Sequence, residues 1–304
     1  MLKKWLKYIC DPIDKTNLVF HKITEQKGED IILGTLKSKS GHIYKIINGV
    51  PILLNNFTQS TSSVDSFAYE WNTFDFDYVK KSWINDVIKP IVSSVNYFKN
   101  KNVIDCGAGS GRQSLWMVEA GAKFVFAIEL SNSATTIVRR VTNKFKNKIF
   151  VIQADIEHLP INKNKINIDI AYCVNVIQHT KNPIKSTGEI SKLLNKNSKF
   201  IFNIYLLRDN KLKIKIIELV KKLLSILSTS SIRKITYIVS IFLYPFWINK
   251  HSFKEFWLDV YDLLGTHSYQ KFYTEKYLEN LLIKSKLKII KRSYYSMLLK
   301  RSNL

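Results

Sequence analysis

Residues 103–111 of this 304-residue chain read Val-Ile-Asp-Cys-Gly-Ala-Gly-Ser-Gly, and this stretch decides the fold. Its apolar beginning predicts the end of a strand, and a helix over residues 110–120 is expected to follow. Glycine has no side chain and adopts positive φ readily, so it lets the chain turn sharply and lets a ligand approach the backbone. The acid and the three alternating glycines of the stretch are Asp105, Gly107, Gly109 and Gly111. This order predicts an α/β fold with a ligand held at the turn.

The glycine spacing differs from that of a dinucleotide-binding loop, whose third glycine would fall at Arg112. The stretch instead resembles the first motif of the class I S-adenosylmethionine-dependent methyltransferases, Asp/Glu-x-Gly-x-Gly-x-Gly. The resemblance implies a Rossmann-like sheet of seven strands and S-adenosyl-L-methionine as the cofactor. It also implies that the acid and the three glycines bind this cofactor.

Further acids follow the next two expected strands. A β-rich run over residues 123–128 ends at Glu129, where a carboxylate suits a ribose because it can accept from both hydroxyls. A short strand over residues 149–152 leads into Asp155 and Ile156. In the family, an Asp at this point accepts from the adenine amino group and the next residue packs on the ring, so the resemblance implies these roles here.

A fourth expected strand, residues 166–173, leads into Asn175 and His179. Similar methyltransferases have a Val/Leu-x-His segment at this point, and the resemblance implies that Asn175 contacts the cofactor. A base is needed only when the acceptor is an alcohol or a weakly acidic carbon. His179 is the candidate for that base, because it lies near the expected methyl position and titrates near neutrality. The alternative is that its ring only packs against the cofactor loop.

Residues 1–57 read as a small β unit with turns near residues 38–41 and 48–49. Its ending resembles a zinc-ribbon-like unit that precedes some methyltransferase domains and holds zinc by two Cys pairs. Here only Cys10 remains of those pairs, and His21 and His42 are the other potential ligands. Because metal sites show closer paired spacing, we expect no metal.

Residues 58–82 are expected to form a linker and a segment that covers the cofactor, followed by a methyltransferase domain over residues 83–304. A helical cap is expected as an insertion over residues 206–272. The end of this insertion resembles the Asp-x-x-x-Pro-x-Tyr…His-x-Tyr/Thr region of similar enzymes. The substrate residues implied by that resemblance are Tyr261, His267 and Tyr269.

The insertion combines a basic amphipathic stretch over residues 209–227 with a charge-free run over residues 235–248. The run is too short to span a bilayer. Residues 209–250 are therefore expected to cap the acceptor site and to touch a membrane surface without crossing it. The alternative is a lid that packs its apolar face on the core.

The chain has a net charge of +23. Such a balance favours nucleic acid, anionic lipid or acidic substrates, but the lysines occur in every segment, so nucleic acid is the less favoured partner. Three cysteines far apart in the sequence favour free thiols in a reducing, cytoplasmic compartment. No signal peptide is recognised. We therefore expect a cytoplasmic protein, with a peripheral contact at the inner membrane face if the insertion touches lipid.

The residues after the fourth expected strand narrow the choice of methyl acceptor. Amino-methylation of adenine normally uses Asn/Asp-Pro-Pro-aromatic there, whereas residues 173–176 read Cys-Val-Asn-Val, and no Pro-Cys nucleophile for cytosine chemistry is present. The segment is similar to methyltransferases of the ubiquinone/menaquinone type. This favours O- or C-methylation of a small-molecule or lipid- or polyprenyl-linked acceptor. An RNA base methyltransferase and a non-catalytic partner protein with this fold are the alternatives.

Overall fold

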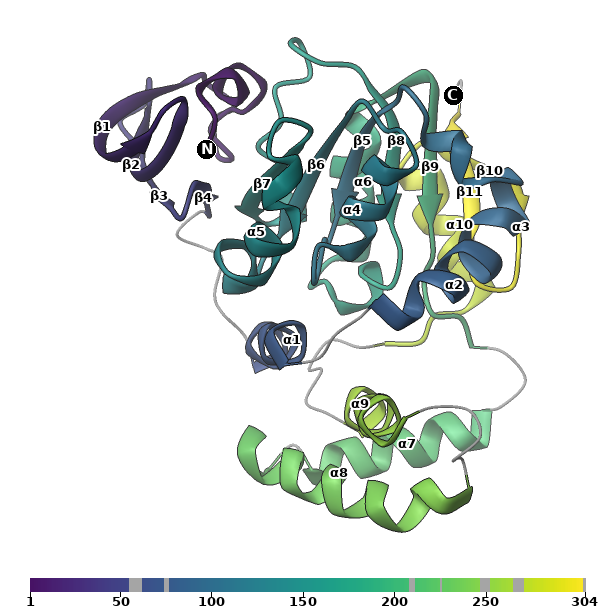
Figure 1. The fold of residues 1–304 in the computed structure, drawn as a ribbon. Helices are drawn as coiled ribbons and strands as arrows, with labels where there is room; N and C mark the ends of the chain where they lie inside the picture. The colour runs from purple at the N-terminus through teal and green to yellow at the C-terminus, as the bar shows by residue number, and fades with distance from the viewer. Residues whose placement is uncertain are drawn as a thin grey trace.

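The computed structural model describes residues 1–54, 62–73, 77–207, 211–224, 226–246, 252–264 and 271–302. The described strands form one mixed sheet in the order β1-β2-β3-β4-β7-β6-β5-β8-β9-β11-β10 (Figure 1). The central strands are β5 (Asn102–Cys106), β6 (Phe124–Glu129), β7 (Ile149–Ala154), β8 (Ile168–Cys173) and β9 (Leu194–Phe202). They run parallel, and the order reverses at β5. Ligands of open α/β sheets bind at the carboxyl ends of the strands beside such a reversal.

The terminal strands β10 (Leu287–Arg292) and β11 (Met297–Arg301) form an antiparallel hairpin. β11 inserts between β9 and β10 and runs antiparallel to both. The strands from β7 to β10 are therefore the seven that were predicted, in adjacent positions.

The sheet nevertheless has eleven described strands rather than seven. The additional strands come from the N-terminal unit and are β1 (Leu18–Lys27), β2 (Asp30–Ser38), β3 (Ile43–Ile47) and β4 (Val50–Leu53). β4 pairs in parallel with β7, so the unit continues the central sheet. The prediction of a separate seven-stranded sheet was wrong in this respect, because the outer edge of β7 offers unpaired backbone groups that another strand can satisfy.

The N-terminal unit also shares the hydrophobic core of the central sheet. The ring of Trp5 stacks on Phe150 with centroids 5.3 Å apart and meets the edges of Phe124 and Phe126. The indole N–H of Trp5 donates to the carbonyl of Lys146 at 3.2 Å. Aromatic pairs of this kind add to the stabilisation from buried area alone.

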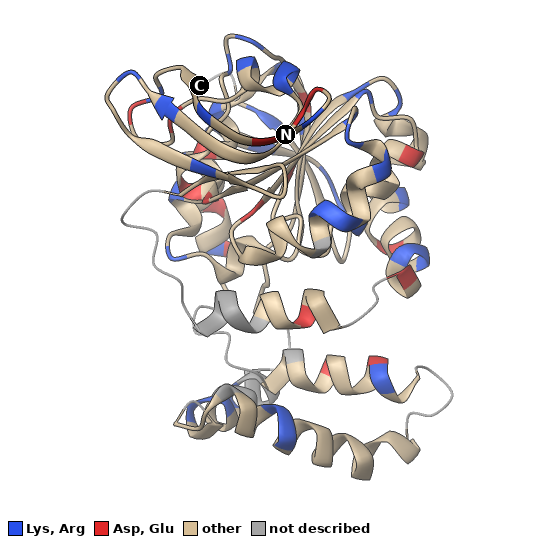
Figure 2. Ribbon diagram, turned by 60° about the vertical axis from the view of Figure 1, so that its left-hand side comes forward, with Lys and Arg blue, Asp and Glu red and all other residues tan. Residues whose placement is uncertain are grey.

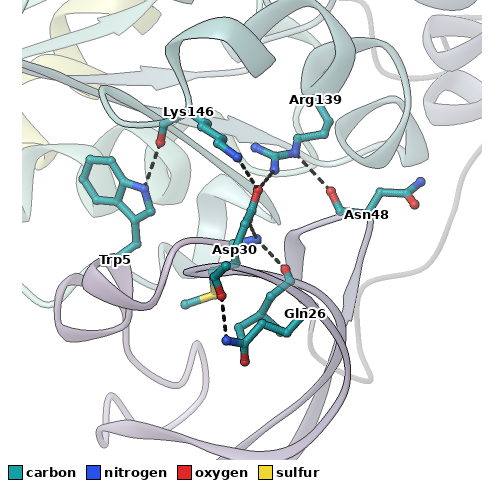
Figure 3. A network of polar contacts seen from close by, with 9 residues as sticks. Trp5, Gln26, Asp30, Asn48, Arg139 and Lys146 are labelled. Carbon is teal, nitrogen blue, oxygen red and sulfur yellow. Dashed lines mark hydrogen bonds and ion pairs between the residues drawn. The ribbon is translucent and has the colours of Figure 1, made fainter.

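Asp30 connects the same unit to α5 (Ile137–Thr142) and the segment after it (Figure 3). Its carboxylate accepts from Arg139 Nη2 at 2.7 Å and from Lys146 Nζ at 3.2 Å, and it also bonds to the terminal amino group. Burial would raise the pKa of Asp30, but these cations together hold the pKa below its usual value. A buried carboxylate held by two basic side chains and a buried amino group fixes the unit against the sheet.

Two helical layers cover the sheet. Alternate strand residues point to opposite faces, so Val103 packs with α4 (Arg112–Glu119), whereas Ile104 lies in the core that includes α6 (Pro183–Lys192) and α10 (Glu275–Lys284). Residues 83–98 form three short helical segments, η3 (Trp83–Ile88), α3 (Lys89–Val92) and η4 (Val95–Phe98). The break between α3 and η4 falls at Ser93, whose φ is 68°.

A helical cap lies beyond the carboxyl edge of the sheet (Figure 1). Its helices are α7 (Lys211–Leu224), α8 (Thr229–Leu243) and α9 (Phe253–Leu264), and the short η9 (Tyr244–Phe246) follows α8. α1 (Ser62–Thr73) lies between the sheet and this cap (Figure 1). Among the described helices, none has the length and apolar character needed to cross a bilayer.

Candidate functional site

The glycine-rich turn after β5 has the backbone geometry that the sequence implied. The φ angles of Gly107, Gly109 and Gly111 are 92°, 56° and 78°, a region that L side chains rarely adopt. The N–H groups of Gly107 and Ala108 donate to the carbonyl of Ile128 at 2.9 and 2.8 Å, which fixes the turn against β6. A Cβ at Gly107 would overlap the methyl groups of Val176, the second of them at 2.8 Å. The turn is therefore packed so closely that only glycine fits this position.

Asp105 lies beneath the turn and not in the cavity beside it. It is 1% exposed, and its carboxylate accepts from the hydroxyl of Ser114 in α4 at 2.6 Å. Burial raises the pKa of Asp105 to about 7, and the nearby Glu129 adds to the rise. In this geometry Asp105 positions the start of α4 and the turn, and it is absent from the cavity lining.

Glu129 lies at the end of β6, where its carboxylate holds two backbone groups. It accepts from the N–H of Gly109 and from that of Ser131, each at 2.9 Å. Burial raises the pKa of Glu129, although these hydrogen bonds oppose the rise. A carboxylate has about four lone-pair sites, so lone pairs remain for the hydroxyls of a ribose.

A cavity of about 580 Å³ opens at the carboxyl ends of β5, β6 and β8. Its floor contains the turn from Gly107 to Ser110, and its far wall contains residues 174–176 and His179. Aromatic side chains line much of the remainder, namely Phe67, Trp71, Tyr78, Trp83, Tyr172, Tyr205 and Tyr295. This volume lies in the range of small-ligand sites.

The segment after β7 supplies the side of the cavity expected to face adenine. Asp155 and Ile156 both line it. One oxygen of Asp155 accepts from the N–H of Glu157 at 2.8 Å and thereby starts a short helical turn. Glu157 also lines the cavity and accepts from the backbone of Asn182 at 2.9 Å. Asp155 and Ile156 therefore lie on the same cavity as the glycine-rich turn.

Asn175 lines the cavity after β8 in the left-handed conformation, with a φ of 61°. Its N–H donates to Oδ1 of Asn203 at 2.6 Å, and Nδ2 of Asn203 donates to Oδ1 of Asn175 at 2.7 Å. Asn203 was not predicted, because it contacts the site through another residue. An amide directly after a buried strand is the only sequence signal that could have indicated it.

His179 lies between two aromatic rings at the cavity wall. The ring of Phe67 in α1 and that of Tyr205 after β9 meet it edge-on, with centroids 5.0 and 6.0 Å away. The ring position is thus fixed by packing from two separate elements. The geometry agrees with both roles considered for His179, which are a base facing the acceptor and a packing group.

The helix α1 covers the glycine-rich turn. A Cβ at Gly109 would lie 3.2 Å from the ring of Trp71, which shows how closely this ring approaches the turn. The rings of Phe67 and Trp71 stack with centroids 6.0 Å apart. The expectation that residues 58–82 cover the cofactor remains a prediction, and the part of α1 that the structure describes lies where such a cover is needed.

The predicted substrate residues have different positions. Tyr261 is 1% exposed, and its ring packs against Tyr69 of α1, so it lies behind the cavity wall. From the same helix, α9, it is Leu258 and Asp259 that line the cavity. His267 and Tyr269 lie outside the described residues.

The charge of the lining is opposite to that of the whole chain. Among the described lining residues, Lys181 is the only Lys or Arg. Six carboxylates line the same cavity, from Glu70, Asp86, Glu129, Asp155, Glu157 and Asp259. A lining of this kind favours a positively charged ligand, because opposite charges in a partly desolvated site attract strongly.

The potential metal ligands of the N-terminal unit do not gather as considered from the sequence. Among the described residues, the group close enough to share an ion consists of Asp11, Asp14 and His42. Nδ1 of His42 lies 2.8 Å from Asp11, and Asp14 accepts from the hydroxyl of Ser40. Cys10 is buried, and neither it nor His21 belongs to this group.

Two further cavity residues escaped prediction because their role depends on a distant partner. The indole N–H of Trp83 donates to the hydroxyl of Tyr172 at 3.0 Å, and both side chains are buried. Burial raises the pKa of this hydroxyl well above its usual value, so it remains protonated. These residues are 89 positions apart, and nothing in the sequence connects them.

Comparison with known proteins identifies a methyltransferase domain in the central part of this chain. Residues 104–202 match the family model described as a methyltransferase domain. The chain is 32% identical over 117 residues to protein arginine N-methyltransferase 1 of Oryza sativa subsp. indica. This aligned stretch covers 36% of this chain and 30% of that protein. It is also 32% identical over 124 residues to the histone-arginine methyltransferase CARMER of Drosophila persimilis. This aligned stretch covers 40% of this chain and 23% of that protein. The chain thus spans less than a third of the length of these relatives.

Among solved structures, one similar fold is the 1,6-didemethyltoxoflavin-N1-methyltransferase of Burkholderia thailandensis, determined with S-adenosylhomocysteine. The identity is 11% and the TM-score 0.48, over 83% of this chain and 96% of that one. The family match marks residues 104–202 as a methyltransferase domain, and the cofactor of this domain is S-adenosyl-L-methionine. The glycine-rich turn, Glu129 and the lining residues after β7 and β8 are compatible with that cofactor.

Proposed function

We propose that this protein transfers the methyl group of S-adenosyl-L-methionine to a small-molecule or lipid-linked acceptor, at an oxygen or a carbon atom. One observation carries the proposal: a single cavity joins the glycine-rich turn and Glu129 to a wall of aromatic rings around His179. The turn and Glu129 would hold the cofactor, and the aromatic wall would hold a flat or apolar acceptor beside it.

The cofactor supplies an activated methyl group on a sulfonium. The residues of this chain then have three tasks, which are to bind the cofactor, to align the acceptor with its methyl group and to exclude water. Backbone N–H groups and Glu129 would bind the cofactor at one end of the cavity. The rings of Phe67, Trp71 and Tyr205 exclude water and restrict the orientation of the acceptor.

For an acceptor with a hydroxyl or an acidic C–H, His179 would accept the proton as the new bond to the methyl carbon forms. Its ring is held edge-on by Phe67 and Tyr205, so it can face the acceptor without losing its position. A positioned base of this kind contributes about 10²- to 10⁴-fold to a rate.

The size of the cavity supports a small reacting group. About 580 Å³ has to contain the cofactor and the reacting part of the acceptor together. Positive residues also do not gather at the cavity, because Lys181 is the only Lys or Arg among its described lining residues, and Figure 2 shows Lys and Arg positions on the N-terminal unit, the sheet and the helices alike. Both observations speak against an RNA helix as the acceptor, since RNA binding needs a continuous basic surface.

A second candidate is N-methylation of a basic nitrogen, which the charge of the lining favours. Three of the lining carboxylates come from elements outside the cofactor-binding strands, namely Glu70 of α1, Asp86 of η3 and Asp259 of α9. A protonated amine would be attracted to this wall and would lose its proton before reaction. The acceptor would then retain a positive charge after methylation.

Labelling separates these candidates. The protein is incubated with methyl-tritiated cofactor and a cell lysate, and the label is measured in organic-extractable, small-molecule, RNA and protein fractions. The main proposal expects label in the organic-extractable or small-molecule fraction, in a compound whose charge is unchanged. Label in a small cation supports N-methylation of a small amine, label in Lys or Arg residues of protein supports N-methylation of a protein, and label confined to RNA would contradict both candidates. Calorimetric titration with S-adenosylhomocysteine, for which we expect binding, tests the non-catalytic alternative separately.

A further inference from the structure

The cap helix α8 exposes large apolar side chains on its outward face and buries hydroxyl side chains on its inward face. Its inward face carries Ile232, Thr236 and Ser240, each 0% exposed. Its outward face carries Ile238, Ile241 and Phe242, which are 53%, 49% and 72% exposed. In a helix that covers a water-soluble core, the large apolar side chains face inward. Here Ile232 faces inward beside two hydroxyl side chains, whereas Ile238, Ile241 and Phe242 face away from the protein.

The inward hydroxyls of α8 need no water. The hydroxyl of Thr236 donates to the carbonyl of Ile232 at 2.9 Å, and that of Ser240 donates to the carbonyl of Thr236 at 2.7 Å. Their hydrogen-bonding capacity is thus used within the helix itself. Small side chains on this face also let α8 approach α9 closely. The orientation of α8 is therefore compatible with its internal packing, and the outward apolar face is a property of the folded protein.

The helix α7 exposes a similar stripe. Ile216, Leu219 and Leu223 follow helical spacing and are 54%, 60% and 60% exposed. Lys215 and Lys222, also exposed, lie along one side of this stripe. An apolar stripe bordered by lysines is the pattern of a helix that lies at a membrane surface.

The apolar exposure is concentrated in these two helices and the residues directly after each of them. The described residues include 23 exposed large hydrophobic side chains, and 11 of them lie between Ile216 and Phe246. In Figure 2 the lowest helix, α8, accordingly shows a long stretch without charge. A concentration of this kind marks an interaction surface, because scattered single residues are normal and a cluster is not.

We propose that the outward faces of α7 and α8 form a docking surface for an anionic lipid bilayer. The charge of the segment selects this occupant. Residues 211–246 contain seven Lys and Arg and a single acid, Glu218. A second copy of the chain would bring two positive surfaces together, whereas anionic headgroups complement the lysines while the outward rings and aliphatic chains enter the acyl boundary.

The docking surface is connected to the cavity through α9. The ring of Tyr237 in α8 meets that of Trp257 in α9 edge-on, with centroids 5.0 Å apart. The next residues of α9, Leu258 and Asp259, line the cavity. The guanidinium of Arg233 in α8 also lies 3.6 Å from the ring centre of Tyr69 in α1, the helix over the glycine-rich turn. A bilayer held by α8 would thus lie one helix away from the cavity.

Vesicle sedimentation tests the docking surface without any assay of methyl transfer. The full chain is mixed at low salt with vesicles of phosphatidylcholine and phosphatidylglycerol (3:1) or of phosphatidylcholine alone. We expect binding to the anionic vesicles that falls with added salt, because the attraction to headgroups is screened. The triple variant I238S/I241S/F242S should bind at least tenfold more weakly, and K215Q/K222Q should lose the salt dependence in part.

Matched controls identify the surface. The variant V19S/I23S/I43S removes three exposed aliphatic side chains from the N-terminal strands, and K288Q/K291Q removes two exposed lysines from β10. Both should bind vesicles like the unchanged protein. Equal loss in the controls, or no binding to anionic vesicles at low salt, would overturn the proposal. A concentration-dependent dimer that I238S/I241S/F242S abolishes, in a protein that ignores vesicles, would assign the face to a second copy instead. Titration with S-adenosylhomocysteine shows separately that each variant is folded.

Discussion

Asn175 and Asn203 bind each other through two hydrogen bonds, at 2.6 and 2.7 Å, across the carboxyl ends of β8 and β9. One bond uses the backbone N–H of Asn175 and the other its side-chain oxygen. Asn203 also donates to the carbonyl of Tyr295 at 3.2 Å, so one amide connects two strands and the terminal hairpin. The left-handed conformation of Asn175, which places it on the cavity wall, depends on this pair.

Replacement of Asn203 by Ala should weaken cofactor binding. The N–H and the side-chain oxygen of Asn175 would lose their partners, at a cost of about 0.5–1.5 kcal/mol for each hydrogen bond, since Asn175 is exposed and water can replace Asn203. We expect roughly tenfold weaker binding of S-adenosylhomocysteine in calorimetry, together with lower stability to urea. Asn197→Ala, at an exposed position of β9, is the control and should change neither. Full affinity in Asn203→Ala would show that the pair does not support the cofactor site.

Replacement of Gly107 by Ala should abolish cofactor binding, because the new Cβ would overlap Val176 and the φ of 92° is strained for alanine. The double variant G107A/V176A removes the overlapping methyl groups but not the backbone strain, so it should recover binding in part. The control is Gly188→Ala, since no atom lies within 4 Å of a Cβ there. That change lies within α6 and should be neutral or slightly stabilising. Normal calorimetric binding by the Gly107→Ala variant would contradict the geometry of the turn.

Replacement of Asp105 by Asn should change how stability depends on pH. The folded pKa of Asp105 is about 7, well above the usual 3.8. The unfolded chain therefore loses this proton near pH 4 and the folded chain near pH 7, so the stability of the unchanged protein falls as the pH rises between these values. At 1.36 kcal/mol per pH unit the fall approaches about 4 kcal/mol.

Urea unfolding at pH 4, 5.5 and 8 provides the measurement for Asp105. The Asn variant lacks the titration, and its stability relative to the unchanged protein should rise steadily over this range. Ser114→Ala leaves the carboxyl in place and is the comparison. If the free energies of unfolding of the Asn variant and of the unchanged protein varied in parallel with pH, the shifted pKa would not belong to Asp105.

Replacement of His179 by Phe separates its two possible roles. Phenylalanine can still pack against Phe67 and Tyr205 but cannot accept a proton. With an acceptor identified by labelling, we expect kcat to fall by about 10²-fold or more, with unchanged affinity for S-adenosylhomocysteine. The pH profile of kcat should also lose its acidic limb. Unchanged kcat and pH profile would assign His179 to packing alone.

Much of the central fold follows from local sequence, because apolar runs such as residues 124–128 alternate with turns and amphipathic helices. The start of α10 also has a local cause, because the hydroxyl of Thr274 accepts from the N–H of Tyr277 at 3.1 Å and so caps the helix. β1 was missed because most of its residues are exposed, and many are polar. The break between α3 and η4 depends on a positive φ at Ser93, and the residue type gives no signal for it, because serine rarely adopts positive φ.

The site shows the same division between local and distant information. Glycine or acidic residues lie at or directly after the carboxyl ends of β5, β6 and β7. The candidate cofactor residues could therefore be found one by one from the sequence. The partner of a residue such as Tyr172 or Asn175 is set by tertiary packing, and sequence spacing does not reveal it. The parallel pairing of β4 with β7 was missed for this reason, since it joins residues about a hundred positions apart.

That pairing also constrains the order in which the chain can fold. Ile52 pairs with Gln153, so β4 has no partner until the chain through β7 has been synthesised. Contacts of such long sequence separation form late, because loop closure must precede them. During this interval the N-terminal hairpins can form locally, but Trp5 has no Phe150 to stack on. The nascent N-terminal segment must therefore keep an aromatic surface uncovered while a hundred further residues are added, which makes it a natural contact for a chaperone during synthesis.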